Sequence, residues 1–263
     1  MVHAVLNCGF ARSYIISGED GLMVVDVGSI GTAKDVVAHI NNTPGMMLHD
    51  VRYIMATHFH IDHIGGIGHF LRKCPPETKV LFHRFVEGYL TGTRKMSPIR
   101  NWFVGLVPAS LASARYIRRF SHLKFESLSG IPLPGLRNIV KLPYEHNKIG
   151  YFGDGKCVRY KLGFDDWEII ETPGHTEDSV SFYNESSGEL ICGDLIVNME
   201  KNGKGKLNLF HWSRDVITKT YRDLCNTTNP KVIYPGHGEI ITGDGNTLLT
   251  VKAFTKHFKK WTQ

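Results

Sequence analysis

The stretch MATHFHIDHIGG, residues 55–66, places three histidines and one aspartate within six positions: His58, His60, Asp62 and His63. In an extended chain residues i and i+2 point the same way, so His58 and His60 can reach one ion. Asp62 and His63 follow where the chain turns into a helix, and they can face a second ion. Imidazole and carboxylate ligands suit Zn²⁺, and they also accept iron or manganese. We therefore expect two divalent metal ions, with zinc as the first choice, rather than a solvated surface turn.

Further candidate ligands follow apolar segments elsewhere in the chain. WEIIET runs into Pro-Gly-His175, GELICG runs into Asp194, and KVIY runs into Pro-Gly-His237. VRYIMAT leads into His58 in the same way. The carboxyl ends of strands are where α/β proteins bind ligands, because the strand ends are rigid and the loops beyond them are free to vary. We expect His175, Asp194 and His237 to complete the site, with the two carboxylate oxygens of Asp194 bridging the ions.

Strand and helix signals alternate along the chain, which is typical of an α/β fold. Expected strands are 4–9, 13–17, 22–28, 51–57, 79–83, 157–163, 167–172, 180–184, 188–194 and 231–236. Helical patterns cover 32–42, begin at 65–73, and cover 214–225, where Ser213 is the expected cap. The hydrophobic share of 42% over 263 residues allows a large core, and we expect a single domain over 1–263.

Residues 84–146 interrupt this alternation and are interpreted as a basic, aromatic, helical insertion. From 84 to 124 there are eight basic residues and the single acid Glu87, an excess of 8 − 1 = +7 against a net charge of +6 for the whole chain. The insertion is a candidate cap over the active site, and Trp102, Arg115 and Arg118 are its candidate substrate contacts. The alternatives are a structural subdomain with solvated arginines, an oligomer contact, or a contact with a partner or membrane surface.

The motif order resembles that of the metallo-β-lactamase superfamily over nearly the whole chain. T-H-x-H-x-D-H-x-G-G at Thr57–Gly66 is similar to the form found in glyoxalase II-like thioesterases and acyl-homoserine lactonases, and Asp26 in VVDVGS matches the upstream structural D-x-G. The resemblance implies an αββα sandwich with the metals at one edge. It assigns His58, His60 and His175 to metal 1, Asp62, His63 and His237 to metal 2, and Asp194 to both. True class B β-lactamases usually have cysteine where Asp194 stands, so antibiotic hydrolysis is not favoured.

Asp26 is expected to hold the first histidine loop by hydrogen bonds without binding metal itself. His211 is an open candidate for substrate contact, because FHWS lies in the loop 198–212 that could return to the site. Five cysteines in odd number, with no C-x-x-C pair, indicate neither a disulfide framework nor a cysteine zinc site. With no signal-peptide pattern and no apolar run long enough for a membrane span, we expect a cytoplasmic protein.

These features predict a dinuclear metal-dependent hydrolase acting on an ester, thioester or lactone. Two cations would lower the pKa of a shared water from about 15.7 toward neutrality and make a hydroxide available, and Asp62 or Asp194 could relay a proton to the leaving group. The expected partner is a small substrate with an anionic or acyl part, and nucleic acid is not favoured. The alternatives are a phosphodiesterase, a mononuclear iron oxidoreductase of the persulfide-dioxygenase kind, and a binding module without activity. The sequence leaves the oligomeric state open.

Overall fold

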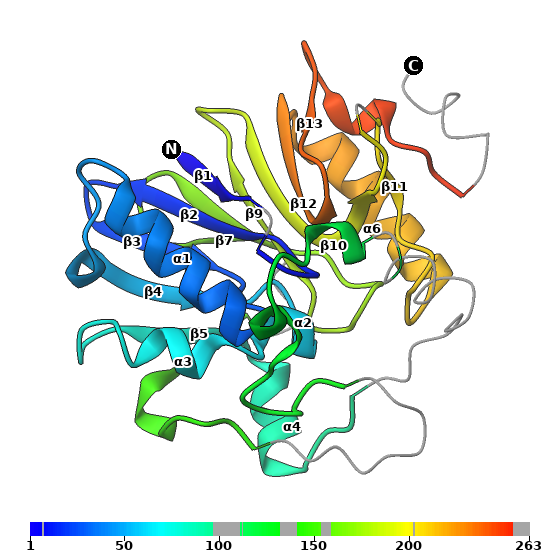
Figure 1. The fold of residues 1–263 in the computed structure, drawn as a ribbon. Helices are drawn as coiled ribbons and strands as arrows, with labels where there is room; N and C mark the ends of the chain where they lie inside the picture. Colours follow the sequence, from blue (N-terminus) through cyan, green and yellow to red (C-terminus); the bar gives the residue numbers. More distant parts are fainter. Residues whose placement is uncertain are drawn as a thin grey trace.

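Two β-sheets form the frame of the protein (Figure 1). The computed structural model describes residues 1–6, 8–96, 111, 113–131, 141–153, 159–201 and 203–254. The first sheet has six strands in the order of the sequence: β1 (Val2–Val5), β2 (Ser13–Gly18), β3 (Gly21–Val25), β4 (Val51–Met55), β5 (Lys79–His83) and β6 (Ile149–Phe152). The first three strands pair antiparallel, and β3 to β6 pair parallel.

The second sheet has seven strands in the order β13-β12-β10-β9-β8-β7, with β11 pairing to β10 off this path. Their bounds are β7 (Arg159–Lys161), β8 (Trp167–Glu171), β9 (Val180–Asn184), β10 (Glu189–Asn198), β11 (Lys206–Leu207), β12 (Val232–Gly238) and β13 (Ile241–Thr242). β10 and β12 are parallel, and the other neighbours are antiparallel. The register between β10 and β12 shifts at Gly193 and again before Val197, so this pair is irregular where it carries Asp194.

Helices cover the outer faces of both sheets. They are α1 (Ile30–Asn42), α2 (Ile61–Ile64), α3 (Ile67–Leu71), α4 (Phe85–Thr91) and α6 (Arg214–Thr227). Short 3-10 helices lie at η1 (Leu48–Asp50), η3 (Ala114–Tyr116), η4 (Phe120–Leu123), η5 (His146–Lys148) and η6 (Thr247–Thr250). The hydroxyls of Ser29 and Ser213 accept the N–H groups of Thr32 and Val216 and cap α1 and α6. No helix in the described part of the chain is long and apolar enough to cross a membrane.

Alternating side chains along the strands build three apolar layers. Tyr14 and Ile16 of β2 face the second sheet and pack with Trp167 and Phe182, whereas Ile15 between them faces outward. The outward side chains of the first sheet pack under α1 and α3, and those of the second sheet pack under α6. The resulting order of layers is helix, sheet, sheet, helix, and Figure 1 shows α1 and α6 on opposite sides of the paired sheets. The expected αββα sandwich is therefore confirmed.

Several element bounds differ from the sequence prediction. β6 and the short strands β11 and β13 were not predicted, because each is brief and is completed by pairing with a distant segment. Asp194 was expected at the end of a strand, but β10 continues through it to Asn198 across the irregularity at Gly193. His237 likewise lies within β12. Trp102 and residues 97–110 of the expected helical insertion lie outside the described residues, whereas its described part over residues 114–131 contains only the short 3-10 helices η3 and η4.

One segment of the insertion, residues 113–131, runs from the end of β12 to α2. Segment 113–131, drawn in green in Figure 1, contacts Glu239 through Tyr116 and α1 through the pair His122–Asp35. Further along, the carbonyl of Gly130 accepts the N–H of Ile61 at the start of α2. This segment therefore touches the chain on both sides of the candidate ligands.

Candidate metal centre

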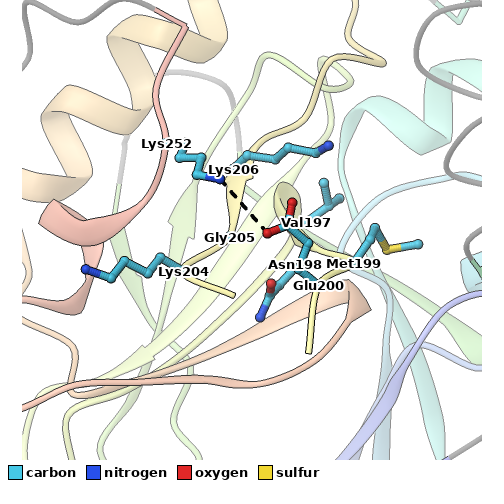
Figure 2. A pocket seen from close by; sticks show the side chains of 8 residues that line it. All are labelled: Val197, Asn198, Met199, Glu200, Lys204, Gly205, Lys206 and Lys252. Carbon is cyan, nitrogen blue, oxygen red and sulfur yellow. Dashed lines mark ion pairs between the residues drawn. The ribbon is translucent and has the colours of Figure 1, made fainter. Parts of the chain in front are cut away.

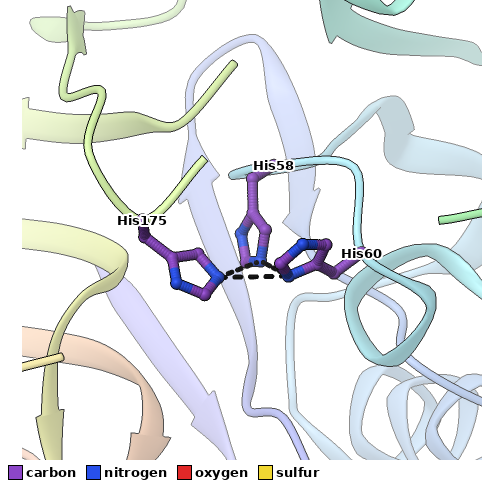
Figure 3. A group of neighbouring side chains, drawn as sticks. All are labelled: His58, His60 and His175. Atoms are coloured by element: carbon purple, nitrogen blue, oxygen red, sulfur yellow. Dashed lines mark hydrogen bonds between the residues drawn. The ribbon is translucent and has the colours of Figure 1, made fainter. Parts of the chain in front are cut away.

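Three histidine nitrogens meet at the edge between the two sheets. His58 Nε2 lies 3.0 Å from His60 Nδ1, and His175 Nε2 lies 3.2 Å and 3.1 Å from these two atoms (Figure 3). Each neutral ring has one N–H, so hydrogen bonds alone cannot satisfy a mutual contact of three ring nitrogens. A tetrahedral zinc ion about 2.0–2.1 Å from each nitrogen would satisfy all three and hold them about 3.3 Å apart. The triad therefore fits a cation.

Hydrogen bonds on the far side of two of these rings orient them toward the shared point. His175 Nδ1 donates to the carbonyl of Phe210 at 2.5 Å, which leaves Nε2 unprotonated toward the other two rings. His58 Nδ1 contacts the hydroxyl of Thr57 at 3.1 Å. All three rings are buried. Burial lowers the pKa of His58 and His60 well below the ordinary value, and the neighbouring imidazoles lower it further. The rings are thus neutral, which is the form that binds metal.

A second group of side chains lies beside the triad. His237 Nε2 is 3.4 Å from Asp62 Oδ2 and 3.3 Å from Asp194 Oδ2, and His63 Nε2 is 3.4 Å from Asp194 Oδ1. The ligand atoms of Asp62, His63 and His237 all lie within 4.8 Å of one another. His63 Nε2 and Asp194 Oδ1 are buried and have no hydrogen-bond partner among the described residues. Buried polar atoms normally have a partner, so these two also fit a cation.

Asp194 lies between the two groups. Its Oδ2 atom is 3.4 Å from His175 Nε2 of the triad and 3.3 Å from His237 Nε2, and its Oδ1 faces His63. Burial alone would raise the pKa of this carboxyl, but the surrounding histidines His237 and His63 lower it well below its usual value. A carboxylate placed in this way can serve two cations at once, as the sequence motif suggested.

Both sheets contribute to the centre. β4 leads into His58 and His60, and α2 carries Asp62 and His63. His175 follows β8, whereas Asp194 and His237 lie on the neighbouring strands β10 and β12. The structure thus brings together all seven candidate ligands. Gly236 permits this approach, because a Cβ atom at that position would lie 2.2 Å from Asp194 Oδ1.

Asp26 holds the loop that carries His58 and His60 in place by hydrogen bonds. Its Oδ1 accepts the backbone N–H of Thr57 at 2.8 Å, and its Oδ2 accepts the Thr57 hydroxyl at 2.8 Å and lies 2.7 Å from His63 Nδ1. The residue has φ +60°, a left-handed conformation that aspartate and asparagine tolerate better than most residues. Through these contacts Asp26 directs His63 Nε2 toward the centre.

Asp178 was not singled out from the sequence, yet it supports the same loop. Its side chain is buried, and Oδ2 accepts the N–H of Phe59 at 2.8 Å, midway between the ligands His58 and His60. Burial raises the pKa of this carboxyl. In the sequence, Asp178 is recognisable only as an acidic residue three positions after His175. This spacing is too common to assign the residue a role before the fold is known.

The described candidate substrate-binding residues lie at the edge of the metal centre or away from it. His211 is buried, and its ring centroid lies 5.5 Å from that of Phe254. Arg115 stacks on Tyr116 and lies 3.6 Å from Glu239, two residues beyond His237. Arg118 instead lines a cavity of about 370 Å³ beside α1 and β1, whose lining includes none of the seven candidate ligands. Trp102 lies outside the described residues.

A lysine-lined hollow lies near the far end of β10 (Figure 2). Lys204, Lys206 and Lys252 surround it, and Lys252 Nζ is 4.0 Å from a carboxylate oxygen of Glu200. Its volume of about 20 Å³ is close to the room that one water needs. This hollow is too small for a substrate, and it includes none of the candidate ligands.

Comparisons with known proteins identify the family of the chain. The family model described as the metallo-β-lactamase superfamily matches residues 6–80 and 116–237, and the chain belongs to this superfamily. It is similar to "Probable metallo-hydrolase YqjP" of Bacillus subtilis (strain 168), with 25% identity over 246 residues, which cover 87% of this chain and 67% of that protein. It is also similar to the hydroxyacylglutathione hydrolase of Francisella tularensis subsp. novicida, with 30% identity over 112 residues, 41% of this chain and 40% of that one.

The fold is also found among solved structures. The archaeal metallo-β-lactamase superfamily protein ST1585 from Sulfolobus tokodaii superimposes with a TM-score of 0.56 at 18% identity, covering 92% of this chain and 81% of that one. At this identity the likeness shows the fold alone. The resemblance drawn from the sequence is therefore confirmed at the level of the family and of the fold.

Proposed function

We propose that the protein is a dinuclear metallohydrolase that cleaves an ester, thioester or lactone. The observation that carries this proposal is the position of Asp194 between the histidine triad and the group Asp62, His63 and His237. Two clusters that share one buried carboxylate are suited to two cations a few ångströms apart. The second cluster favours this proposal over a mononuclear iron oxidoreductase, which would leave those side chains unused.

Cations held at this centre would supply Lewis acidity and would lower the pKa of a coordinated water toward neutrality. The triad His58, His60 and His175 would hold one ion, and Asp62, His63 and His237 the other. The side chain of Asp62 is 28% exposed, against 6% for Asp194, so Asp62 is the carboxylate with access to an arriving substrate. We assign Asp62 the transfer of a proton to the leaving group through its Oδ atoms. Asp194 would stay ionised and fix the spacing of the two groups.

The ligand chemistry leaves the metal open among zinc, iron and manganese, because imidazole and carboxylate accept all three. We propose zinc, because a set of imidazole nitrogens with a carboxylate oxygen is a donor set that zinc commonly takes in proteins. The partial similarity to a hydroxyacylglutathione hydrolase supports an acyl substrate, a thioester first. The basic insertion favours an anionic group on that substrate, and it also keeps phosphodiester hydrolysis as a second candidate.

Elemental analysis of the protein purified without added metal, together with a substrate panel, tests the proposal. We expect two ions per chain and turnover of at least one thioester, lactone or carboxylic ester. One ion per chain under metal excess would contradict the shared role of Asp194. Turnover confined to phosphodiesters would replace the acyl proposal with the second candidate.

A further inference from the structure

Three hydrogen bonds between the loop that contains residues 10–12 and the chain around His237 hold this part of β12 in place. The carbonyl of Phe10 accepts the His237 Nδ1–H at 2.9 Å. Two residues later, the backbone N–H of Arg12 donates to the carbonyl of Gly236 at 2.7 Å, and Arg12 Nε donates to the carbonyl of Gly238 at 2.7 Å. Arg12 thus donates hydrogen bonds to the carbonyls of the residues on either side of His237. The carbonyl of Phe10, in the same loop, fixes which nitrogen of the His237 ring carries the proton. Such contacts decide where Nε2 of the ring points.

The guanidinium of Arg12 is held in place by the insertion. It lies 4.4 Å from the ring centroid of Tyr116, and the guanidinium of Arg115 lies 4.7 Å from the same ring. The hydroxyl of Tyr116 donates to Glu239 Oε1 at 2.5 Å, and Arg12 Nη2 lies 3.5 Å from Glu239 Oε2. Tyr116 therefore binds the face of Arg12 and also the residue two positions after His237.

Keeping Arg12 at this position is costly. Its side chain is 6% exposed, and its Nη1 atom is buried with no hydrogen-bond partner among the described residues. Burying a charged group with an unsatisfied donor opposes folding unless other contacts compensate for it. A smaller apolar side chain at position 12 would avoid this cost but could not reach the carbonyl of Gly238. The arrangement is thus better explained by its effect on His237 than by its contribution to packing.

We propose that Arg12 is a positioning residue for His237, and that Tyr116 couples the insertion to the second metal through it. The inference rests on the proposed dinuclear function, because His237 belongs to the second group of ligands. It gives the insertion a defined role apart from contact with substrate. Loss of Tyr116 should loosen Arg12, widen the range of positions open to His237 Nε2, and weaken binding of the second ion selectively.

Titration of metal-free protein with Co²⁺, followed by the visible absorption of the bound ion, tests the coupling without any substrate. Wild-type protein should bind two ions in two resolvable phases. Tyr116→Ala should weaken the second phase by about tenfold and leave the first unchanged, since partners that orient a ligand typically carry effects of that size. Tyr116→Phe keeps the ring over Arg12 and loses only the hydrogen bond to Glu239, so its second phase should fall between the two.

Tyr151→Ala is the matched control. Tyr151 is a partly buried tyrosine on β6 that packs into the core of the first sheet, and β6 carries no candidate ligand. This variant should lower the melting temperature of the metal-free protein while both cobalt phases stay as in the wild type. If Tyr116→Ala does not fold, the comparison of Tyr116→Phe with the wild type decides the question.

The cobalt titration distinguishes a failure of the proposed coupling from a failure of the proposed two-metal function. Two cobalt phases that are unchanged in both Tyr116 variants, or that weaken equally, would overturn the coupling and leave the dinuclear function standing. A saturating stoichiometry of one cobalt ion per chain in the wild-type protein would overturn the two-metal function and the coupling together. Selective weakening of the second phase, in the order wild type, Tyr116→Phe, Tyr116→Ala, supports the proposal.

Discussion

Asp62 differs from its neighbours in the centre by its exposure. The histidines of the triad are at most 4% exposed, whereas the Asp62 side chain is 28% exposed and reaches His237 with one oxygen. A residue at this position can meet a substrate and exchange a proton, but it contributes little packing. Its removal should therefore affect the chemistry more than the fold.

We predict that Asp62→Ala lowers kcat by at least about a hundredfold, because loss of such a group typically costs several kcal/mol of barrier. The melting temperature of the metal-free variant should stay close to that of the wild type. Steady-state kinetics and a thermal melt measure the two effects. The control is Asp223→Ala, which removes an exposed acid that pairs with Lys219 in the described part of the chain, and it should change neither kcat nor the melting temperature appreciably. Near wild-type turnover in Asp62→Ala would remove this residue from the mechanism.

Asp26, unlike Asp62, is buried, and its carboxylate is hydrogen-bonded to Thr57 and His63. Asp26→Asn preserves shape and tolerates the left-handed backbone, but it replaces one acceptor oxygen by a donor amide. We expect metal affinity to fall by roughly 10–100-fold. Competition with a chromogenic chelator measures this loss. Unchanged affinity would show that metal binding does not depend on the second carboxylate oxygen of Asp26.

At the scale of elements, segment 113–131 contacts both margins of the centre. Its arginines have different surroundings: Arg115 lies beside Glu239 near His237, whereas Arg119 pairs with Asp35 on α1. Within segment 113–131 the basic residues therefore have two roles, one near the ligands and one that fastens the segment to α1. Of these two arginines, Arg115 is the one placed to attract a substrate at short range.

We predict that Arg115→Gln raises KM for an anionic substrate several-fold and changes KM for a neutral analogue little. The difference should shrink as salt is added, because salt screens exposed charges over about 10 Å at 0.1 M. Arg119→Gln is the matched control and should leave the ratio of the two KM values unchanged. An equal rise in both KM values would assign Arg115 a structural role through Tyr116.

The seven candidate ligands could be found from the sequence because each stands in a short motif beside an apolar strand. The strands other than β6, β11 and β13 could be found because alternating side chains face different layers, as Tyr14, Ile15 and Ile16 do. Arg12, Tyr116 and Asp178 could not be found in this way. Their partners lie far along the chain, for example 226 residues away for the bond from Arg12 to Gly238, and no local pattern encodes such a contact.

At the scale of the whole molecule, the ligands come from both sheets and from segments between residues 58 and 237. An ion bound by His58, His60 and His175 would join the first sheet to the second. Because a ligand that binds only the folded state stabilises it by RT ln(1 + [L]/Kd), bound metal should add a few kcal/mol to the free energy of unfolding.

We predict that chelation lowers the melting temperature by several degrees and that added Zn²⁺ restores it. Calorimetry of the loaded, stripped and reloaded protein measures the change. A variant lacking His175 should melt as the stripped wild type does and should respond weakly to zinc. An unchanged melting temperature after complete removal of metal would mean that the two sheets hold together without the ion.

The order of the ligands along the chain has a consequence for biosynthesis. Translation delivers the triad when His175 has emerged from the ribosome, but the second group stays incomplete until His237, sixty-two positions later. On the proposed two-metal function, the triad would be available to an ion while β12 is still missing from the nascent chain. The second ion would bind only after β12 has been synthesised. We therefore expect metal scarcity during synthesis to yield half-loaded protein that carries its single ion on the triad.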